Sequence, residues 1–321
     1  MEAIYRINDL NKSYPYPGGG LLKKNRKTFQ AVDHVNLEIN QGDTFGIVGE
    51  SGSGKTTLAR LLMRLITPTS GSILYKGQDI FRMNRRELKT TRKEIQMIFQ
   101  DPYSSLDPRK TILDIVAEPL KVHKIGKALV IRDKIVETMS LVDLPTTNDF
   151  LEKTPIEISG GQRQRVGIAR ALVLKPKFIV ADEPVSMLDA SIKAGIVELM
   201  KQLREKIDLT YVFITHELAL AYHFCNKLAV MYLGEVVEMG DIDDVVQSPA
   251  HPYTKLLIDA IPPIEPDPEW LNKPFGKTDF SRKQQGCKFY QRCPHPHASC
   301  LHSRPSLTEL KRGHMVACQS A

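Results

Sequence analysis

The stretch TFGIVGESGSGKTTLARLLMRL, residues 44–65, decides the fold of this chain. It begins with a short apolar run, residues 45–48, that is typical of a buried strand. A loop follows with the sequence Gly49-Glu50-Ser51-Gly52-Ser53-Gly54-Lys55-Thr56, and a helical pattern begins immediately after it. The loop matches G-x-x-x-x-G-K-[ST] between a strand and a helix, which is the context that identifies a phosphate-binding loop.

The residue types of this loop explain its chemistry. Three glycines let the backbone turn tightly and approach an anion closely. Successive backbone N–H groups and the positive end of the following helix then hold a polyphosphate. We expect Lys55 to reach the outer phosphates and the Thr56 hydroxyl to bind Mg²⁺. The other residues expected at the phosphate site are Gly49, Ser51, Gly52, Ser53, Gly54 and Thr57.

The composition is that of an ordinary globular protein, with 321 residues, 42% of them hydrophobic and 25% charged. No run of about 18 apolar residues occurs, so the sequence predicts no membrane-spanning helix. The N-terminal residues MEAIYRINDL lack an export-signal pattern, and we expect a cytosolic chain. The net charge of +7 is concentrated in residues 286–321, which carry five Lys or Arg and one Glu. This distribution does not favour a nucleic-acid partner.

Hydrophobic periodicity predicts an α/β protein in which strands alternate with helices around a largely parallel sheet. The predicted strands include residues 45–48, 95–99, 178–181 and 211–214, with helices at 161–174, 190–207 and 217–225. Two further strands are expected near the N-terminus, and residues 227–239 predict a hairpin. The expected organisation is one domain over residues 1–260 with a helical insert at about 101–159, a Pro-rich linker at 261–285 and a Cys-rich segment at 286–321.

Polar side chains follow three of these strands where each one ends. Asp182 and Glu183 follow residues 178–181, His216 follows 211–214, and Gln100 follows 95–99. Ligands of open parallel sheets bind at the carboxyl ends of the strands, beside the phosphate loop. We therefore expect Asp182, through water, to hold Mg²⁺, with Thr56 and the Gln100 oxygen contributing. Glu183 is the candidate to orient and deprotonate an attacking water, and His216 the candidate contact to the γ-phosphate.

A second candidate anion site is the segment Ser159-Gly160-Gly161-Gln162. Ser159 fits a helix N-cap, and Gln162 completes a capping box. Two glycines in a first helical turn reduce helix stability, but they suit a ligand that approaches the backbone closely. Because the chain already has one phosphate loop, this second site suggests a nucleotide held between two subunits.

These motifs, in this order, resemble the motif set of ABC transporter ATPases. The Walker A motif, Q-loop, signature, Walker B motif, D-loop and switch histidine correspond to residues 49–56, Gln100, 158–162, 178–183, 186–189 and His216. The resemblance implies ATP and Mg²⁺ as ligands, and a P-loop NTPase core sheet with an antiparallel β subdomain and a helical insert. Ile158 and Met187 replace the usual Leu and Ala, but both are apolar, so we expect an active site.

The same resemblance assigns further roles. Tyr14 is similar to the aromatic residue that stacks on adenine, with Tyr16 as the alternative. Two ATPase subunits are expected to close head to tail. Residues that then act on the partner's nucleotide are Ser159, Gly160, Gly161, Gln162 and Asp189.

Three further stretches resemble those of ATPases from dipeptide and oligopeptide importers: FQDPYSSLDPR at 99–109, HPYT at 251–254, and the Cys-rich tail. The implied partners are two integral-membrane permease subunits docked at residues 101–120, a second and paralogous ATPase, and indirectly an extracytoplasmic solute-binding protein. The implied location is the cytoplasmic face of the cell membrane. Nickel or oligosaccharide import is the alternative within the family. A soluble ABC ATPase of translation or DNA repair is the alternative outside it, although such proteins usually carry two cassettes or a coiled-coil insert.

The tail has the spacing Cys287-x₅-Cys293-x₆-Cys300-x₁₇-Cys318, without the C-x₂-C pairs of common zinc sites. Four thiolates can hold Zn²⁺ or an iron–sulfur cluster. The resemblance favours a 4Fe-4S cluster, while nearby histidines leave zinc open on spacing alone. Several prolines discourage regular structure, so we expect a bound metal to fold the segment.

Overall fold

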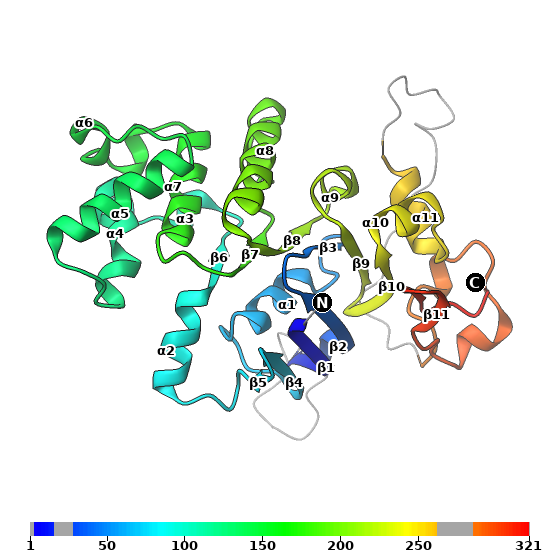
Figure 1. Ribbon diagram of the computed structural model, residues 1–321. Coiled ribbons are helices and arrows are strands. Elements are labelled where there is room, and N and C mark those ends of the chain that lie inside the picture. The colour runs from blue at the N-terminus through cyan, green and yellow to red at the C-terminus, as the bar shows by residue number, and fades with distance from the viewer. Residues whose placement is uncertain (1–2, 16–27, 262–284, 321) are drawn as a thin grey trace.

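The structure is a computed structural model that describes residues 3–15, 28–261 and 285–320 (Figure 1). Its strands form two sheets. The smaller sheet is antiparallel, with the order β2-β1-β4-β5. Its strands are β1 (Ala3–Pro15), β2 (Thr28–Asn40), β4 (Ser70–Tyr75) and β5 (Gln78–Asp79). The two N-terminal strands are longer than the apolar pattern predicts, because their outer halves pair with each other while remaining partly exposed.

The larger sheet has eight strands in the order β11-β12-β10-β9-β3-β8-β7-β6. Five neighbouring strands are parallel: β9 (Lys227–Tyr232), β3 (Thr44–Val48), β8 (Thr210–Thr215), β7 (Phe178–Asp182) and β6 (Ile95–Ile98). Every residue of β3, β7 and β8 is buried. Their nearly continuous apolar sequences follow from this position, since helices or a second sheet cover both faces. The predicted parallel sheet is confirmed.

Strands from the tail complete this sheet at one edge. The predicted hairpin is present, because β10 (Glu235–Asp241) pairs antiparallel with β9. β12 (His314–Val316) then pairs with β10, and β11 (Thr308–Lys311) pairs with β12. The expectation that prolines keep the tail irregular is therefore wrong for residues 308–316, which follow the last of those prolines and pair with an available edge strand.

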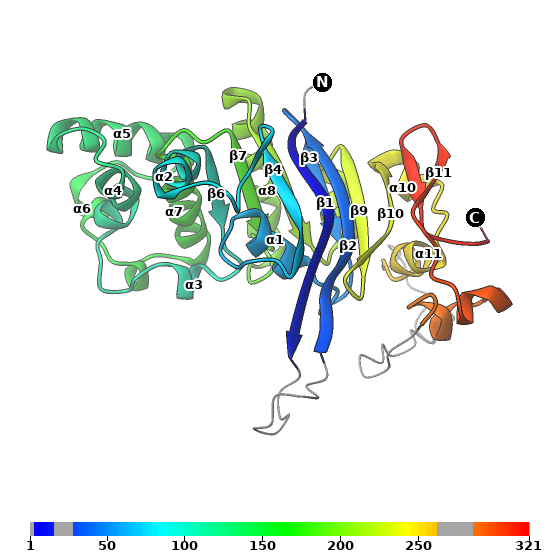
Figure 2. The same cartoon turned by 90° about the horizontal axis from the view of Figure 1, so that it is seen from below.

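One face of the large sheet packs against α1 (Lys55–Leu62) and the smaller sheet. The underside view shows α1 beside the β1–β2 and β4 strands (Figure 2). Leu58, Leu61 and Leu62 are fully buried there, with Ile7 and Leu10 of β1 in the same cluster. The phosphate loop therefore connects two elements, β3 and α1, that are both buried in a core.

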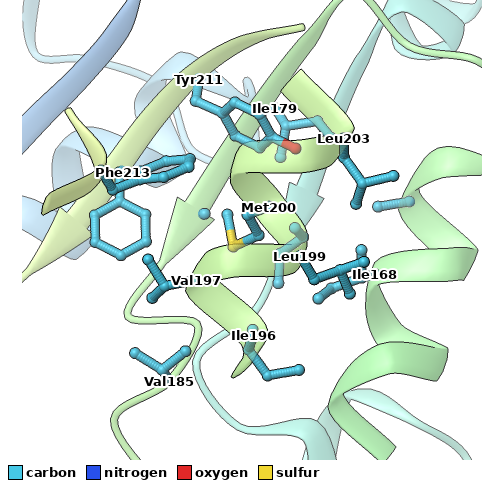
Figure 3. Close-up of a cluster of buried hydrophobic side chains, with 14 of the residues drawn as sticks. Ile168, Ile179, Val185, Ile196, Val197, Leu199, Met200, Leu203, Tyr211 and Phe213 are labelled. Carbon is cyan, nitrogen blue, oxygen red and sulfur yellow. The ribbon is translucent and has the colours of Figure 1, made fainter. Parts of the chain in front are cut away.

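Helices cover the other face. In Figure 3, apolar side chains of α8 (Ala190–Ile207), including Val197, Met200 and Leu203, lie against the strands that carry Ile179, Tyr211 and Phe213. The remaining helices of this side are α9 (Leu218–Phe224), α10 (Ile242–Gln247) and α11 (Pro252–Asp259), whereas Leu88 of α2 (Arg85–Glu94) packs against the cluster on the side of the smaller sheet. The sequence pattern did not predict α2, because it is highly charged; its start is set by a capping box between Asn84 and Glu87.

The residues after β6 form a helical region at one end of the molecule (Figure 1). It contains α3 (Pro102–Ser105), α4 (Ile112–Val122), α5 (Ala128–Leu141), α6 (Asn148–Leu151), the 3₁₀ turn η2 (Pro155–Glu157) and α7 (Gly160–Leu172). The tail lies at the opposite end, with two 3₁₀ turns, η3 (Tyr290–Arg292) and η4 (Ala298–Leu301). The predicted linker lies almost wholly in the 262–284 gap, outside the described residues. Within the described ranges, none of the helices combines the length and apolar character that crossing a bilayer requires.

Candidate functional site

The phosphate loop runs from the end of β3 to the start of α1, and its backbone requires glycine. Gly49 and Gly54 have φ values of 153° and 104°, where a side chain is strained. A Cβ added at Gly49 would lie 2.2 Å from the Met231 carbonyl oxygen, and one at Gly54 would lie 2.1 Å from the Ala31 carbonyl oxygen. These two glycines therefore allow the close approach of β9 and β2 that supports the loop.

Lys55 is buried at the first position of α1. Its Nζ donates hydrogen bonds to the carbonyl oxygens of Gly49 and Glu50, at 2.6 and 2.9 Å, and to Ser53 Oγ at 3.3 Å. Burial lowers the Lys55 pKa, although the charges of Glu183, Asp182 and Glu50 oppose that effect. The ammonium group thus points into the loop, where an anion can take the place of the two carbonyl oxygens.

A candidate Mg²⁺ site lies beside this lysine. Thr56 Oγ1 donates a hydrogen bond to Asp182 Oδ1 at 3.2 Å, so two of the predicted ligands are in contact. Burial raises the Asp182 pKa to about 6; the Thr56 hydrogen bond opposes the shift and the Glu183 charge adds to it. A buried carboxylate with a raised pKa is suited to a cation that would compensate its charge. Hydroxyl and carboxylate oxygens are the donors that Mg²⁺ prefers, so these residues fit the ion.

Polar side chains that follow the ends of β6, β7 and β8 lie close together. Glu183 Oε2 accepts a hydrogen bond from Gln100 Nε2 at 3.1 Å and lies 3.2 Å from His216 Nδ1. Glu183 has a left-handed backbone, with φ of 46°, and its N–H donates to the Ile214 carbonyl oxygen of β8 at 2.9 Å. A non-glycine residue in this conformation is uncommon and is often found at active sites. The predicted meeting of Gln100, Glu183 and His216 is confirmed, although the catalytic roles assigned to them stay predictions.

The signature segment lies in the helical region, at the start of α7. Ser159 Oγ accepts a hydrogen bond from the Gln162 N–H at 3.3 Å, and Gln162 Oε1 accepts one from the Ser159 N–H at 3.1 Å. The predicted capping box is confirmed. Among the described residues, neither of these two side chains bonds to the 49–56 loop of the same chain. Asp189 is likewise the N-cap residue of α8, without a side-chain capping bond.

Tyr14 lies near the end of β1. Its ring is 5.7 Å from the Phe29 ring, and Lys12 Nζ lies 5.0 Å from its centroid. This ring is half-buried in the smaller sheet, and its adenine-stacking role stays a prediction. The alternative, Tyr16, lies outside the described residues.

The four tail cysteines line one pocket, together with His251, Phe289 and residues of 293–305. The Cys287 N–H donates to the Cys300 carbonyl oxygen at 2.8 Å, which brings two of the cysteines together. None of the four forms a disulfide within the described part of the chain, and burial raises the Cys287 pKa to about 11. In the described part of the chain, no three His, Cys, Asp or Glu side chains are arranged to hold a metal ion. Four cysteines in one pocket are the residue types that a thiolate-ligated metal group needs. Their side chains, however, are not arranged around a common point in the described residues.

Sequence reasoning missed one contact of the phosphate loop. Arg292, in the tail, donates from both Nη atoms to the two carboxylate oxygens of Glu50, each at 2.8 Å. The Glu50 N–H donates to Tyr253 Oη at 2.8 Å. No local sequence pattern reveals the ion pair, because 242 positions separate Arg292 from Glu50.

A second missed contact joins the helical region to the signature. The Arg163 guanidinium lies 4.0 Å from the centroid of the Tyr103 ring and donates to the carbonyl oxygens of Pro155 and Ile158. Tyr103 belongs to the segment predicted to meet a membrane partner. The arginine next to the signature is thus in contact with that segment.

Comparison with known proteins gives matches along most of the chain. Residues 32–186 match the family model for ABC transporters, and residues 237–300 match the model for the oligopeptide/dipeptide transporter C-terminal region. The oligopeptide transport ATP-binding protein OppF of Salmonella typhimurium is 44% identical over 91% of this chain and 88% of its own length. The oligopeptide transport ATP-binding protein AppF of Bacillus subtilis is 40% identical, with 99% and 97% covered.

Solved structures give a similar result. The ATP-binding cassette MJ0796, in a dimeric post-hydrolysis state bound to ADP and Pi, superposes with a TM-score of 0.65 and 30% sequence identity. The match covers 74% of this chain and 98% of that cassette. CbiO1 of Clostridium perfringens, part of the CbiONQ transporter complex, gives the same TM-score at 26% identity and covers 77% of this chain.

Proposed function

The chain belongs to the ABC transporter family of ATPases, and from this premise we propose that it powers the import of oligopeptides or dipeptides. Relatives with oligopeptide transport in their names align over nearly their full length. The match of residues 237–300 to the oligopeptide/dipeptide transporter region supports the same solute class. Import of nickel or oligosaccharides is the alternative, and a measurement of which solute is taken up distinguishes it from peptide import.

The observation that carries the ATPase part of the proposal is the polar cluster at the strand ends. Glu183 is held by Gln100 and His216, and it follows directly on Asp182, which contacts Thr56. We assign binding of the ATP phosphates to the 49–56 loop and Lys55, whose ammonium exchanges the Gly49 and Glu50 carbonyl oxygens for phosphate oxygens.

Hydrolysis follows from this arrangement. Glu183 accepts the proton of the attacking water, while Gln100 and His216 keep its carboxylate oriented. Thr56, Asp182 and Gln100 would hold Mg²⁺, which when bound would stabilise the negative charge of the transferred phosphoryl group. The roles of Ser51, Gly52, Ser53 and Thr57 are those of backbone and side-chain donors around the phosphates.

Each nucleotide requires a second subunit. The Ser159–Gln162 helix start exposes backbone donors and belongs to the helical region rather than to the phosphate loop. We assign it, with Asp189, to the nucleotide of a partner ATPase, which the family resemblance makes a paralogue. The dimeric state of the MJ0796 cassette supports this arrangement.

The membrane partners are two permease subunits that receive their solute from an extracytoplasmic binding protein, which places this chain at the cytoplasmic face. Residues 101–120 are the proposed docking surface. Tyr103 supports the assignment, since it is 60% exposed and also contacts Arg163 beside the signature. A rearrangement of the permease can thus be transmitted to the signature segment through the stacked side chains of Tyr103 and Arg163.

The decisive experiment is reconstitution. The chain is co-purified with its membrane partners from native membranes, placed in liposomes, and tested for ATP-dependent uptake of labelled dipeptides and oligopeptides. Glu183→Gln in this chain is the control and should abolish uptake. Uptake of nickel or an oligosaccharide instead of peptides would establish the alternative solute. Recovery with ribosomes or DNA, and without membrane subunits, would contradict the transporter role.

We also infer that Cys287, Cys293, Cys300 and Cys318 hold a thiolate-ligated metal centre, with a 4Fe-4S cluster favoured over Zn²⁺ by the family resemblance. Support comes from their shared pocket and from the basic residues of the tail, which offset the negative charge of such a group. Binding requires the four sulfurs to draw closer together than they are in the described residues.

Anaerobic purification followed by iron, sulfide and zinc analysis tests this assignment. About four iron and four sulfide per chain, with visible absorption lost in a Cys293→Ser variant, would support the cluster. One zinc per chain would support the alternative. A metal-free chain with four reactive thiols would contradict both.

A further inference from the structure

The tail and the phosphate loop share a short and well-formed contact. Arg292 and Glu50 form a two-pronged ion pair, with both N–O distances at 2.8 Å. The Arg292 side chain is 7% exposed and the Glu50 side chain 33% exposed. Paired hydrogen bonds of this kind are geometrically specific, and the partly buried setting reduces screening by solvent.

Aromatic rings fix the arginine in this position. Its guanidinium lies 5.7 Å from the Tyr232 and Phe289 ring centroids and 6.0 Å from that of Tyr253. Tyr253 also accepts the hydrogen bond of the Glu50 N–H. The Glu50 side chain is therefore held by Arg292, and its backbone by Tyr253, whose ring packs beside Arg292.

A second path joins the tail to the same loop. Lys288 donates to the Leu233 carbonyl oxygen at 2.7 Å, at the turn between β9 and β10. The next residue in that turn, Gly234, donates its N–H to the Ser53 carbonyl oxygen at 2.8 Å. Lys288 and Arg304 also form ion pairs with Asp33 and Glu235, which fix the tail against the core. The two paths reach the phosphate loop at two different residues, Glu50 and Ser53.

The charge of Glu50 makes the first path functionally important. A carboxylate inside a phosphate-binding loop repels the polyphosphate that the loop must hold. The Glu50 carbonyl oxygen also holds Lys55, so a displaced Glu50 would move a hydrogen-bond partner of that lysine. Arg292 neutralises this carboxylate and draws it toward the tail.

We propose that Arg292 is a positioning residue of the ATP site, which couples the cysteine-bearing tail to the phosphate loop through Glu50. The proposal rests on the proposed ATPase function and adds a regulatory connection to it. Arg292 immediately precedes Cys293 and ends the turn η3, so a change at the cysteines moves the guanidinium. If a change in the conformation of the tail alters nucleotide affinity by some factor, then linkage requires bound nucleotide to alter the equilibrium constant of that conformational change by the same factor.

The test is a double-mutant cycle on the full chain, with Kd for a slowly hydrolysed ATP analogue and kcat measured separately. Arg292→Met leaves the Glu50 charge without its arginine and should weaken nucleotide binding roughly five- to tenfold. Glu50→Gln is the second single variant of the cycle, and its measured Kd is the reference against which the double variant is compared. Adding Glu50→Gln to Arg292→Met should restore affinity to within about threefold of the wild type, because no charge then needs neutralising.

A matched control comes from another ion pair of the tail. Lys311 of β11 pairs with Asp244 of α10 at 2.6 Å, away from the phosphate loop. Lys311→Met should leave nucleotide affinity unchanged. Unchanged affinity in Arg292→Met, or a loss that Glu50→Gln does not restore, would overturn the proposal.

The reciprocal measurement does not depend on the folding of Arg292→Met. Hydrogen exchange of residues 285–300 should slow when the analogue binds to the wild type, and should respond less in Glu50→Gln. An equal response in both proteins would overturn the coupling. A wild-type chain that binds no nucleotide would instead refute the ATPase function itself.

Discussion

The two halves of the proposed ATP site differ in how far one chain completes them. On the strand side, Lys55, Thr56, Asp182, Glu183 and the groups around them already contact one another. On the helical side, the Ser159–Gln162 capping box is satisfied internally and has no polar contact with that cluster in the described residues. The strand half is therefore prepared by folding, whereas the function proposed for the signature half requires a partner that brings a nucleotide to it.

The glycines of the two halves sharpen this difference. Gly54 has a left-handed backbone and no room for a Cβ beside Ala31. Gly160 begins α7 with an ordinary helical backbone, and an added Cβ would be 3.8 Å from its nearest neighbour, Leu188. The chain's own structure requires the first glycine but not the second, which points to a ligand outside the chain as the reason for Gly160.

The largest predicted effect is on catalysis by the strand half of the site. Glu183→Gln should lower kcat for ATP hydrolysis by about 10²–10⁴-fold, since it removes the group that accepts the water proton. The amide keeps the shape of the side chain, so nucleotide affinity should stay near the wild-type value. Phosphate release and analogue binding measure the two quantities, and turnover at the normal rate would show that another group is the base.

Next in size is the loss of the loop glycine. Gly54→Ala should weaken nucleotide binding at least about tenfold and lower the free energy of unfolding by about 1–3 kcal/mol, because alanine is strained at this backbone angle and meets the Ala31 carbonyl oxygen. Calorimetric titration and urea unfolding measure the effects. As a control, Gly77→Ala shares the positive φ but has open space around its Cβ, so it should leave nucleotide binding unchanged.

The third prediction concerns pH. Because burial raises the Asp182 pKa to about 6, Mg²⁺ must displace a proton below that pH. Affinity for the magnesium–nucleotide complex should fall by up to about tenfold per pH unit below 6 and level off above it. In the metal-free protein the folded state binds this proton more tightly than the unfolded chain, so the free energy of unfolding should decrease as pH rises from about 4 to 6.

Titrations of Mg²⁺ at several pH values, with Asp182→Asn as the comparison, check this behaviour. The variant has no carboxylate at position 182, so its weaker affinity should lose most of the pH dependence. The same slope in both proteins would assign the titration to another group.

The smallest effect on the isolated chain is predicted for Gly160→Ala. The free energy of unfolding should be unchanged or rise by up to about 1 kcal/mol, because alanine favours a helix more than glycine does. ATP hydrolysis by the assembled pair of subunits should nevertheless fall, since the Cβ occupies the space of the partner's nucleotide. Gly167→Ala, later in the same helix and with open space at its Cβ, should leave hydrolysis unchanged. A destabilised Gly160→Ala would indicate that the glycine serves this chain alone.

Much of the strand half was predictable because its signals are local. The apolar runs specify buried parallel strands, and parallel strands bring their carboxyl ends to one edge, so Gln100, Asp182, Glu183 and His216 had to converge. The capping box of α7 is equally local, since it needs only Ser159 and Gln162 three positions apart. The charged helix α2 was missed because it buries little apolar surface.

The sequence by itself determined the phosphate loop, the polar residues that follow the ends of three strands, and the four cysteines of the tail. Each of these features depends on residues that are close together in the chain. Only the tertiary structure decided that the tail adds β12 and β11 to the edge of the main sheet and that Arg292 meets Glu50 across 242 positions. Such contacts depend on which edges and charges remain available after the core has packed, and no local pattern carries that information.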